Sequence, residues 1–257
     1  MRCARVAIIA ALGLLTGTSI AETGAELRVL AAGATEATVR EVVGAFEKAR
    51  GCTVVLTFAA VGALRDRAFA GEPADVAVVT PAIIAELEAR HLVRAGSRVD
   101  LGRVGGGIAV RAGAPHPAVT TPEELKRALL DAEEVYYADP ATATAGAAFM
   151  KVVDRLGIGD AVRKKGHPAE GGRAAMQAMA KARTRAIGVT QVSEILAVPG
   201  VTLIAPYPGD LQTLTTYSGV VLEATTHTAD AEAFLKFLRS PEVQAKLAKA
   251  GFESAGP

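Results

Sequence analysis

The spacing of hydrophobic residues from Leu27 to Phe46 predicts a β-strand followed by an α-helix. Leu27 to Ala31 alternates toward a buried strand, and the small residues of Ala32 to Glu36 predict a sharp turn. Beyond the turn, apolar residues recur at i, i+3, i+4 and i+7, the spacing of one helix face: Val39, Val42, Val43 and Phe46. The unpaired N–H groups at the start of such a helix, with the positive end of its dipole, favour an anion.

The strand-turn-helix pattern recurs twice in the segment that follows. Thr53 to Phe58 is rich in β-branched residues and precedes a predicted helix over Leu64 to Ala70. Asp75 to Val79 is almost wholly apolar, as in a parallel strand covered on both faces, and Thr80-Pro81 opens a further helix. This order of elements predicts an α/β fold with a doubly wound sheet.

A change of composition at Arg103 predicts that the chain crosses into a second lobe. Val104 to Val110 is glycine-rich yet strand-like, so Gly105 to Gly107 is interpreted as a hinge or a close backbone contact. Pro206 marks a return to the first lobe. We therefore expect two doubly wound α/β lobes joined by a hinge: a first lobe over 22–103, a second over 104–205, and a return segment over 206–257.

Residues 1–21 have the pattern of a secretory signal peptide. Arg2 and Arg5 precede an apolar run from Val6 to Leu15, and Ser19 to Ala21 supplies small residues before the expected cleavage site. The run is shorter than the roughly 20 residues that span a bilayer. We therefore expect a periplasmic mature chain without membrane insertion, the alternative being a retained anchoring helix.

Composition argues against several classes of function. The chain of 257 residues has 28 basic and 27 acidic residues, and loss of Arg2 and Arg5 would leave it close to neutral. Such a charge gives no basis for nucleic-acid binding, and a chain without Trp and with 4% aromatic residues is a poor base-stacking or sugar-binding surface. Only Cys52 would remain after cleavage, so we expect a buried thiol and no intramolecular disulfide.

Catalytic and metal-binding motifs are not evident in the sequence. The four histidines are scattered, and none lies three or four residues from another histidine or a cysteine, so no metal, cofactor or Cys–His nucleophile is expected. Four predicted helix starts instead carry small or hydroxyl residues, and ligands of open α/β sheets lie beyond the carboxyl ends of the strands. These starts are Gly33-Ala34-Thr35, Ala60-Val61-Gly62, Thr142 to Gly146, and Gly171-Gly172-Arg173.

Several segments together match one known family. They are Val29 to Ala34, Phe58 to Ala60, Ala70 to Asp75, Asp139-Pro140 with Ala145-Gly146, Arg173, Gly188-Val189, and Leu235 to Phe252. On these residues the chain resembles the molybdate-binding periplasmic proteins of ABC transporters, within the type 2 solute-binding family. The resemblance covers nearly all of Leu27 to Phe252, and it implies two α/β lobes with the ligand bound between them.

The departures from that family fall at the ligand. Molybdate binders typically place a serine in each of the first two loops and a tyrosine after the Gly188-Val189 strand, where this chain has Ala34, Ala60 to Gly62, and Gln191. Thr35 or Thr142 could replace one of the lost hydroxyls. Ala145 remains where the family uses a backbone N–H.

A larger and more apolar site would need a cationic anchor, and two arginines near the predicted helix starts suit bidentate carboxylate binding. They are Arg65 and Arg173, each of which could instead form an ion pair within its own lobe. The predicted ligand-binding residues are therefore Gly33, Ala34, Thr35, Val61, Gly62, Arg65, Thr142, Thr144, Ala145, Arg173 and Gln191.

The sequence predicts an exported, monomeric solute-binding protein that delivers a small anion to the permease of an ABC importer. Closure of the two lobes would select the bound state. The ligand remains open between molybdate or tungstate and a small organic carboxylate. Two other functions are considered: a ligand-sensing subunit that docks on a receptor, and an enzyme on the same fold, such as a relative of the pyrimidine-precursor synthases. We predict no enzyme, because no nucleophile–base pair is evident.

Overall fold

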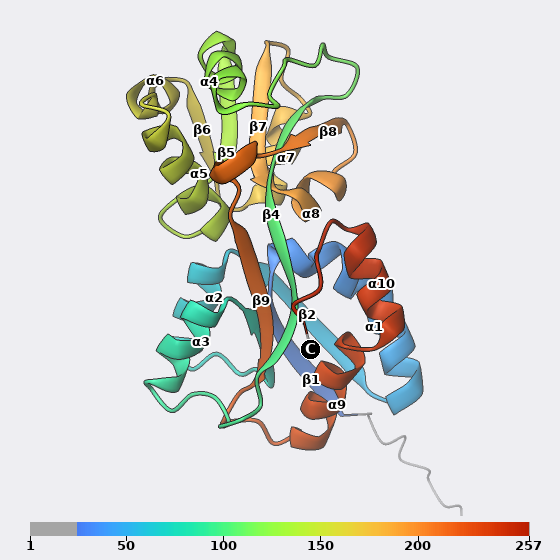
Figure 1. Cartoon of the computed structure of the whole chain (residues 1–257). Helices are drawn as coiled ribbons and strands as arrows, with labels where there is room; N and C mark the ends of the chain where they lie inside the picture. The colour runs from blue at the N-terminus through green and yellow to red at the C-terminus, as the bar shows by residue number, and fades with distance from the viewer. Residues whose placement is uncertain (1–24, 257) are drawn as a thin grey trace, which may run out of the picture.

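The computed structural model describes residues 25–256, so the predicted signal peptide over 1–21 lies outside the described residues. The described chain forms two α/β lobes, one above the other in Figure 1, as the sequence predicts. No helix within residues 25–256 is both long enough and apolar enough to cross a bilayer.

Lobe 1, the lower lobe in Figure 1, has helices on both faces of its sheet. Strand β1 pairs in parallel with β2 and β3, and β3 pairs with β9 in the antiparallel sense. The elements of lobe 1 are β1 (Glu26–Ala32), the 3-10 turn η1 (Gly33–Thr35), α1 (Glu36–Arg50), β2 (Thr53–Ala59), α2 (Val61–Phe69), β3 (Val76–Val79), α3 (Pro81–Glu88), β9 (Leu214–Val221), α9 (Thr228–Leu238) and α10 (Pro241–Lys249).

Lobe 2, the upper lobe, is built around β7, which pairs in parallel with β5 and antiparallel with β4. Strand β6 extends the sheet beyond β5, and β8 pairs with β4. Its elements are α4 (Pro122–Asp131), β5 (Glu134–Ala138), α5 (Thr144–Arg155), α6 (Gly159–Lys164), β6 (Gly166–Ala169), α7 (Gly172–Met179), β7 (Ala186–Gln191), α8 (Val192–Leu196), β8 (Val201–Pro206) and the 3-10 turn η2 (Gly209–Leu211).

The long strand β4 (Val99–Arg111) belongs to both lobes (Figure 1). Its partner is β9 up to Gly105, and from Gly106 onward its partners are β7 and β8. Gly106 lies against the ring of Tyr207, where a Cβ would come within 2.2 Å of the ring carbon Cε2. Gln212 donates to the Gly106 carbonyl (2.9 Å) and accepts from its N–H (3.0 Å). The glycine-rich segment is therefore a close backbone contact at the crossing between the lobes.

Each lobe has its own hydrophobic core. The core of lobe 1 joins residues from both ends of the chain, for example Phe46 of α1 and Phe234 of α9, whose ring centroids lie 5.1 Å apart. In α1 the predicted face is confirmed: Val39, Val42 and Phe46 are buried. Lobe 2 packs around Phe149 and, on the other face, around the methionines of α7. The lobe boundaries 22–103, 104–205 and 206–257 remain a proposal. Tyr207 and Leu211, just past the last boundary, still pack in the core of lobe 2, and the chain rejoins the sheet of lobe 1 at β9.

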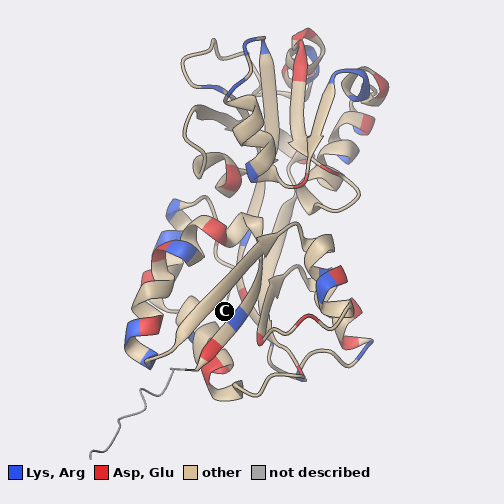
Figure 2. Ribbon diagram, turned by 180° about the vertical axis from the view of Figure 1, so that it is seen from behind, with Lys and Arg blue, Asp and Glu red and all other residues tan. Residues whose placement is uncertain are grey.

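Charged residues of both signs alternate along the outer helices and loops of both lobes in Figure 2. Many of them pair locally, such as Arg40 with Glu36 and Arg163 with Asp160. Exposed pairs of this kind contribute about 0–1 kcal/mol each, so they act chiefly as a solvated surface.

Candidate ligand-binding cleft

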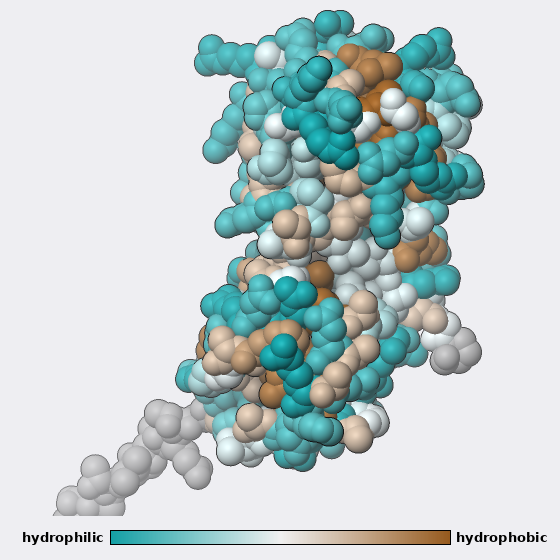
Figure 3. All heavy atoms as spheres, turned by 90° about the vertical axis from the view of Figure 1, so that its left-hand side faces the viewer, coloured by the Kyte–Doolittle hydropathy of each residue, from teal (hydrophilic) through white to brown (hydrophobic). Residues whose placement is uncertain are grey.

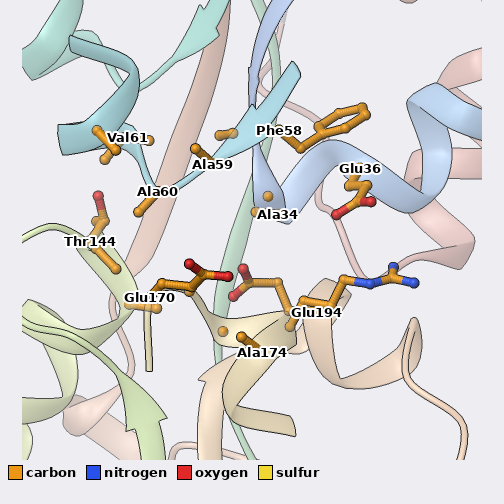
Figure 4. Close-up of a pocket in the computed structure, with 18 of the residues that line it drawn as sticks. Ala34, Glu36, Phe58, Ala59, Ala60, Val61, Thr144, Glu170, Ala174 and Glu194 are labelled. Atoms are coloured by element: carbon orange, nitrogen blue, oxygen red, sulfur yellow. The ribbon is translucent and has the colours of Figure 1, made fainter. Parts of the chain in front are cut away.

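A cleft of about 300 Å³ lies between the lobes, at the carboxyl ends of β1 and β2 and at the starts of α5 and α7. The space-filling view shows the molecule narrowing between the lobes, where pale and brown residues gather (Figure 3). In Figure 4, Ala34, Ala59, Ala60 and Val61 form the wall from lobe 1. The wall from lobe 2 includes Thr144, Glu170, Ala174 and Glu194.

All four predicted helix starts contribute residues to this cleft, which brings together segments far apart in the sequence. Of the predicted ligand-binding residues, those that line it are Gly33, Ala34, Val61, Thr144, Ala145 and Arg173. Their contact with a ligand remains a proposal. The wall from lobe 1 is largely apolar, since alanine and valine side chains from two loops line the cavity.

Four of the remaining predicted residues do not line the cleft and take part in hydrogen bonds within the protein. Thr35 is fully buried, and its hydroxyl donates to the Ala32 carbonyl (2.8 Å), which closes the turn before α1. The N–H of Gly62 donates to the carbonyl of Thr142 (3.0 Å), a hydrogen bond that joins lobe 1 to lobe 2 beside the cleft. Gln191 is buried at the crossing, where its amide is placed to donate to the Gly105 carbonyl (2.9 Å).

The prediction that Arg65 anchors the ligand is corrected by its position. Its guanidinium lies on the outer side of α2, where it contacts Asp66 (2.9 Å) and Glu86 of α3 (3.5 Å). These carboxylates raise its pKa, with the hydrogen bond to Asp66 as the largest cause. Arg65 does not line the cleft. The error lies in the helix face: one turn into α2, the side chain points toward α3.

Arg173 is the only lysine or arginine that lines the cleft within the described chain. It is the second residue of α7, and it is partly buried. The ion pairs of lobe 2 involve other arginines, namely Arg155, Arg163 and Arg185, and they leave Arg173 without a carboxylate partner among the described residues. An unpaired guanidinium at a helix start favours an anion in this cleft.

Glu194 is a cleft residue that the sequence analysis did not identify. It lies in the first turn of α8 and is buried. Its Oε2 accepts from the Thr190 hydroxyl (2.5 Å), and its carboxylate also accepts from the N–H groups of Gln191 and Gly172. Burial raises the pKa of Glu194, these hydrogen bonds oppose that rise, and the nearby charge of Glu36 adds to it.

The other Glu194 oxygen, Oε1, faces lobe 1. A Cβ built on Gly33 would come within 3.2 Å of this oxygen. Tyr217 of β9 also lines the cleft from lobe 1; burial raises its pKa most, and the charge of Glu194 raises it further. Two buried titratable groups from different lobes therefore lie near one another at the cleft.

The position of Glu194 depends on a glycine at the start of α7. A Cβ on Gly172 would lie 1.9 Å from the Thr190 hydroxyl oxygen and 2.0 Å from Glu194 Oε2. No side chain fits there, which explains the absence of a Cβ at this residue.

We expect Gly172→Ala to lower the free energy of unfolding by about 1–3 kcal/mol, the usual cost of overpacking a filled site. Urea unfolding measures the effect. The matched control is Gly171→Ala, because a Cβ at Gly171 meets no atom within 4 Å and the backbone there is extended. Equal stabilities of the two variants would contradict the packing described for Glu194.

A group of three or more His, Cys, Asp or Glu residues able to hold a metal ion is not found within residues 25–256. The groups that line the cleft are apolar side chains from lobe 1, the guanidinium of Arg173 and the carboxyl groups of Glu36, Glu170 and Glu194.

The sequence profile of the bacterial extracellular solute-binding proteins matches residues 27–253. The chain belongs to this family. Among curated relatives, an aconitate isomerase from a Pseudomonas species is 32% identical to this chain over 237 residues, which cover 88% of this chain and 87% of the relative. The chain is 24% identical over 240 residues to the molybdate-binding protein ModA of Escherichia coli, covering 93% and 92%.

Solved structures agree on the fold of this solute-binding protein. The periplasmic molybdate-binding protein of Azotobacter vinelandii superposes with a TM-score of 0.75, at 19% sequence identity, over 90% of this chain and 100% of that one. At this identity the likeness concerns the two-lobed architecture, and it leaves the ligand to be argued from the cleft.

Proposed function

We propose that this solute-binding protein is exported to the periplasm, binds a small organic carboxylate between its lobes, and delivers it to the permease of an ABC importer. The observation that carries the ligand class is Arg173, an unpaired guanidinium that lines a cleft whose wall from lobe 1 is largely apolar. A guanidinium matches the planar, bidentate geometry of a carboxylate. The cavity of about 300 Å³ lies at the lower end of the size range of small-molecule sites.

The loss of hydroxyl donors supports a carboxylate over molybdate. A tetrahedral oxyanion needs several neutral donors around it, and lobe 1 presents Ala34 and Val61 where donors would be needed. A carboxylate with a carbon skeleton instead gains from apolar contact, at roughly 25 cal/mol per Å² of surface removed from water.

We expect Arg173→Ala to weaken binding of trans-aconitate at least tenfold, about 1.4 kcal/mol, in isothermal titration calorimetry. The matched control is Arg65→Ala, which removes a guanidinium from the outer face of α2 and should leave the affinity within about twofold. An affinity of the Arg173→Ala variant equal to that of wild type would contradict the proposed role of Arg173 as anchor.

A second function is supported by the aconitate isomerase relative, which is 32% identical over most of both chains. We propose that the same cleft isomerises an unsaturated carboxylate. An isomerisation by proton transfer needs no nucleophile–base pair; it needs only one group that takes and returns a proton. Conversion of trans-aconitate to cis-aconitate by the purified protein, followed by proton NMR, tests this function.

A further inference from the structure

We propose that Glu194 is the catalytic residue that moves a proton on an unsaturated di- or tricarboxylate bound in the cleft. The proposal rests on the second function above and assigns it to one side chain. It stands on geometry: Glu194 is a buried carboxyl group that lines the cleft, and its Oε1 lies close to Gly33 in the first loop of lobe 1, at the junction of the two lobes.

The carboxyl group is held in one orientation. Oε2 accepts from the Thr190 hydroxyl, and the N–H groups at the starts of α7 and α8 donate to the same carboxylate. Oε2 occupies the space that a Cβ on Gly172 would fill, so the carboxylate packs directly against the start of α7. A general base acts best when it is fixed within reach of one proton of the substrate.

The surroundings of Glu194 also make its carboxylate a stronger base. Burial raises the pKa of Glu194, and the charge of Glu36 adds to this rise, while Thr190 and the N–H groups of Gln191 and Gly172 oppose it. Glu36 is itself paired with Arg40 (2.8 Å), and Tyr217 is the titratable group of β9 at the cleft. A carboxyl group with a raised pKa is a stronger base than a solvent-exposed one.

The reaction is an allylic proton shift. The Glu194 carboxylate takes a proton from the CH₂ group that lies between a carboxylate and the C=C bond of the substrate. The electron pair of that C–H bond forms a new C=C bond to the central carbon, and the former π pair moves to the far alkene carbon. That carbon takes the proton from Glu194. One C–H bond breaks and one forms, the formula is unchanged, and no oxidant, reductant or cofactor takes part.

Arg173 contributes charge to this step. Removal of the proton spreads negative charge over the substrate carboxylates, and a guanidinium at the wall of the cleft stabilises this charge more strongly than it does the ground state. Arg173 therefore supports both binding and conversion, whereas Glu194 is needed for conversion alone.

The test compares wild type, Glu194→Gln and a control, Glu123→Gln, with trans-aconitate as the probe. Glu123 is also a first-turn glutamate of a lobe 2 helix, but it is exposed and does not line the cleft. Calorimetry measures binding, and proton NMR in D₂O measures both conversion to cis-aconitate and uptake of solvent deuterium. We expect Glu194→Gln to bind within about fivefold of wild type and to lose conversion and deuterium uptake at least 100-fold.

The possible outcomes separate the two proposals. Binding by wild type without conversion or deuterium uptake would overturn the role of Glu194 and leave the binding function standing. Conversion by Glu194→Gln at the rate of Glu123→Gln would overturn the assignment to this residue. The absence of binding to any carboxylate would contradict the proposed function and, with it, this inference. Loss of conversion in Glu194→Gln alone, with folding confirmed by an unchanged melting profile, would support it.

Discussion

Gly62→Val is expected to weaken ligand binding at least about a hundredfold, ~2.7 kcal/mol. In the structure, the Gly62 N–H of lobe 1 donates to the Thr142 carbonyl of lobe 2 (3.0 Å). A Cβ on Gly62 would lie 2.9 Å from that carbonyl oxygen and 3.3 Å from the Thr142 Cα, so the two methyl groups of a valine would hold the lobes apart. A ligand that gains contacts to both lobes binds only as well as the closed state is populated.

The matched control for this prediction is Gly44→Val. Gly44 is an exposed residue of α1, and a Cβ there meets no atom within 4 Å. Both changes add a β-branched side chain to a helix of lobe 1, so their effects on helix stability are comparable. Binding by Gly62→Val that equals binding by Gly44→Val would show that the lobe-to-lobe contact at Gly62 is not needed for ligand capture.

Phe234→Ala is expected to lower the free energy of unfolding by about 3–5 kcal/mol, the usual cost of removing a buried phenylalanine. Phe234 is fully buried in α9, and its ring lies edge-on to Phe46 of α1 at 5.1 Å between centroids. The contact joins the return segment to the first lobe. Phe237→Ala is the milder comparison, because Phe237 is only partly buried and its ring lies 5.5 Å from Phe46.

This second prediction also tests the proposed boundaries of the lobes. If 206–257 is part of the first lobe, differential scanning calorimetry of Phe234→Ala should shift the unfolding of lobe 1. Trypsin digestion near the transition should then release fragments from 25–103 and 206–257 together. A loss of the C-terminal helices alone, with 25–103 unaffected, would contradict the boundary.

The alternation and spacing of apolar residues predicted the order of strands and helices because burial in an α/β lobe demands it. The run Asp75 to Val79 illustrates this: β3 is buried at every residue and lies between β1 and β9. The four helix starts were predicted as ligand sites for a similar reason, since parallel strands deliver their carboxyl ends to one edge.

The side chains that face the cleft were harder to predict, because their direction depends on packing. Thr35 and Arg65 both lie near a predicted helix start, yet the first turns inward to the Ala32 carbonyl and the second points toward Glu86. Glu194 looked like an ordinary helix glutamate in the sequence. Its burial depends on two segments distant in sequence, the first loop of lobe 1 and the start of α7, which periodicity within one helix does not reveal.

One local signal for Glu194 was present. Gln191 lies at the N-cap of α8, and Glu194, three residues later, accepts from the Gln191 N–H. This is the return half of a capping box, in which the third residue of the helix fixes its own side chain at the helix start. The pattern predicts a fixed carboxylate, although the cleft beside it became visible only in the fold.

The central claim is that the cleft holds a small organic carboxylate between the lobes. Isothermal titration calorimetry of the mature wild-type protein against trans-aconitate, citrate, succinate, molybdate, tungstate and sulfate tests it most directly. We expect at least one carboxylate to bind with a 1:1 stoichiometry and at least 100-fold more tightly than the three inorganic oxyanions. Tight molybdate binding, with all carboxylates weaker, would contradict the proposal and would support molybdate as the ligand instead.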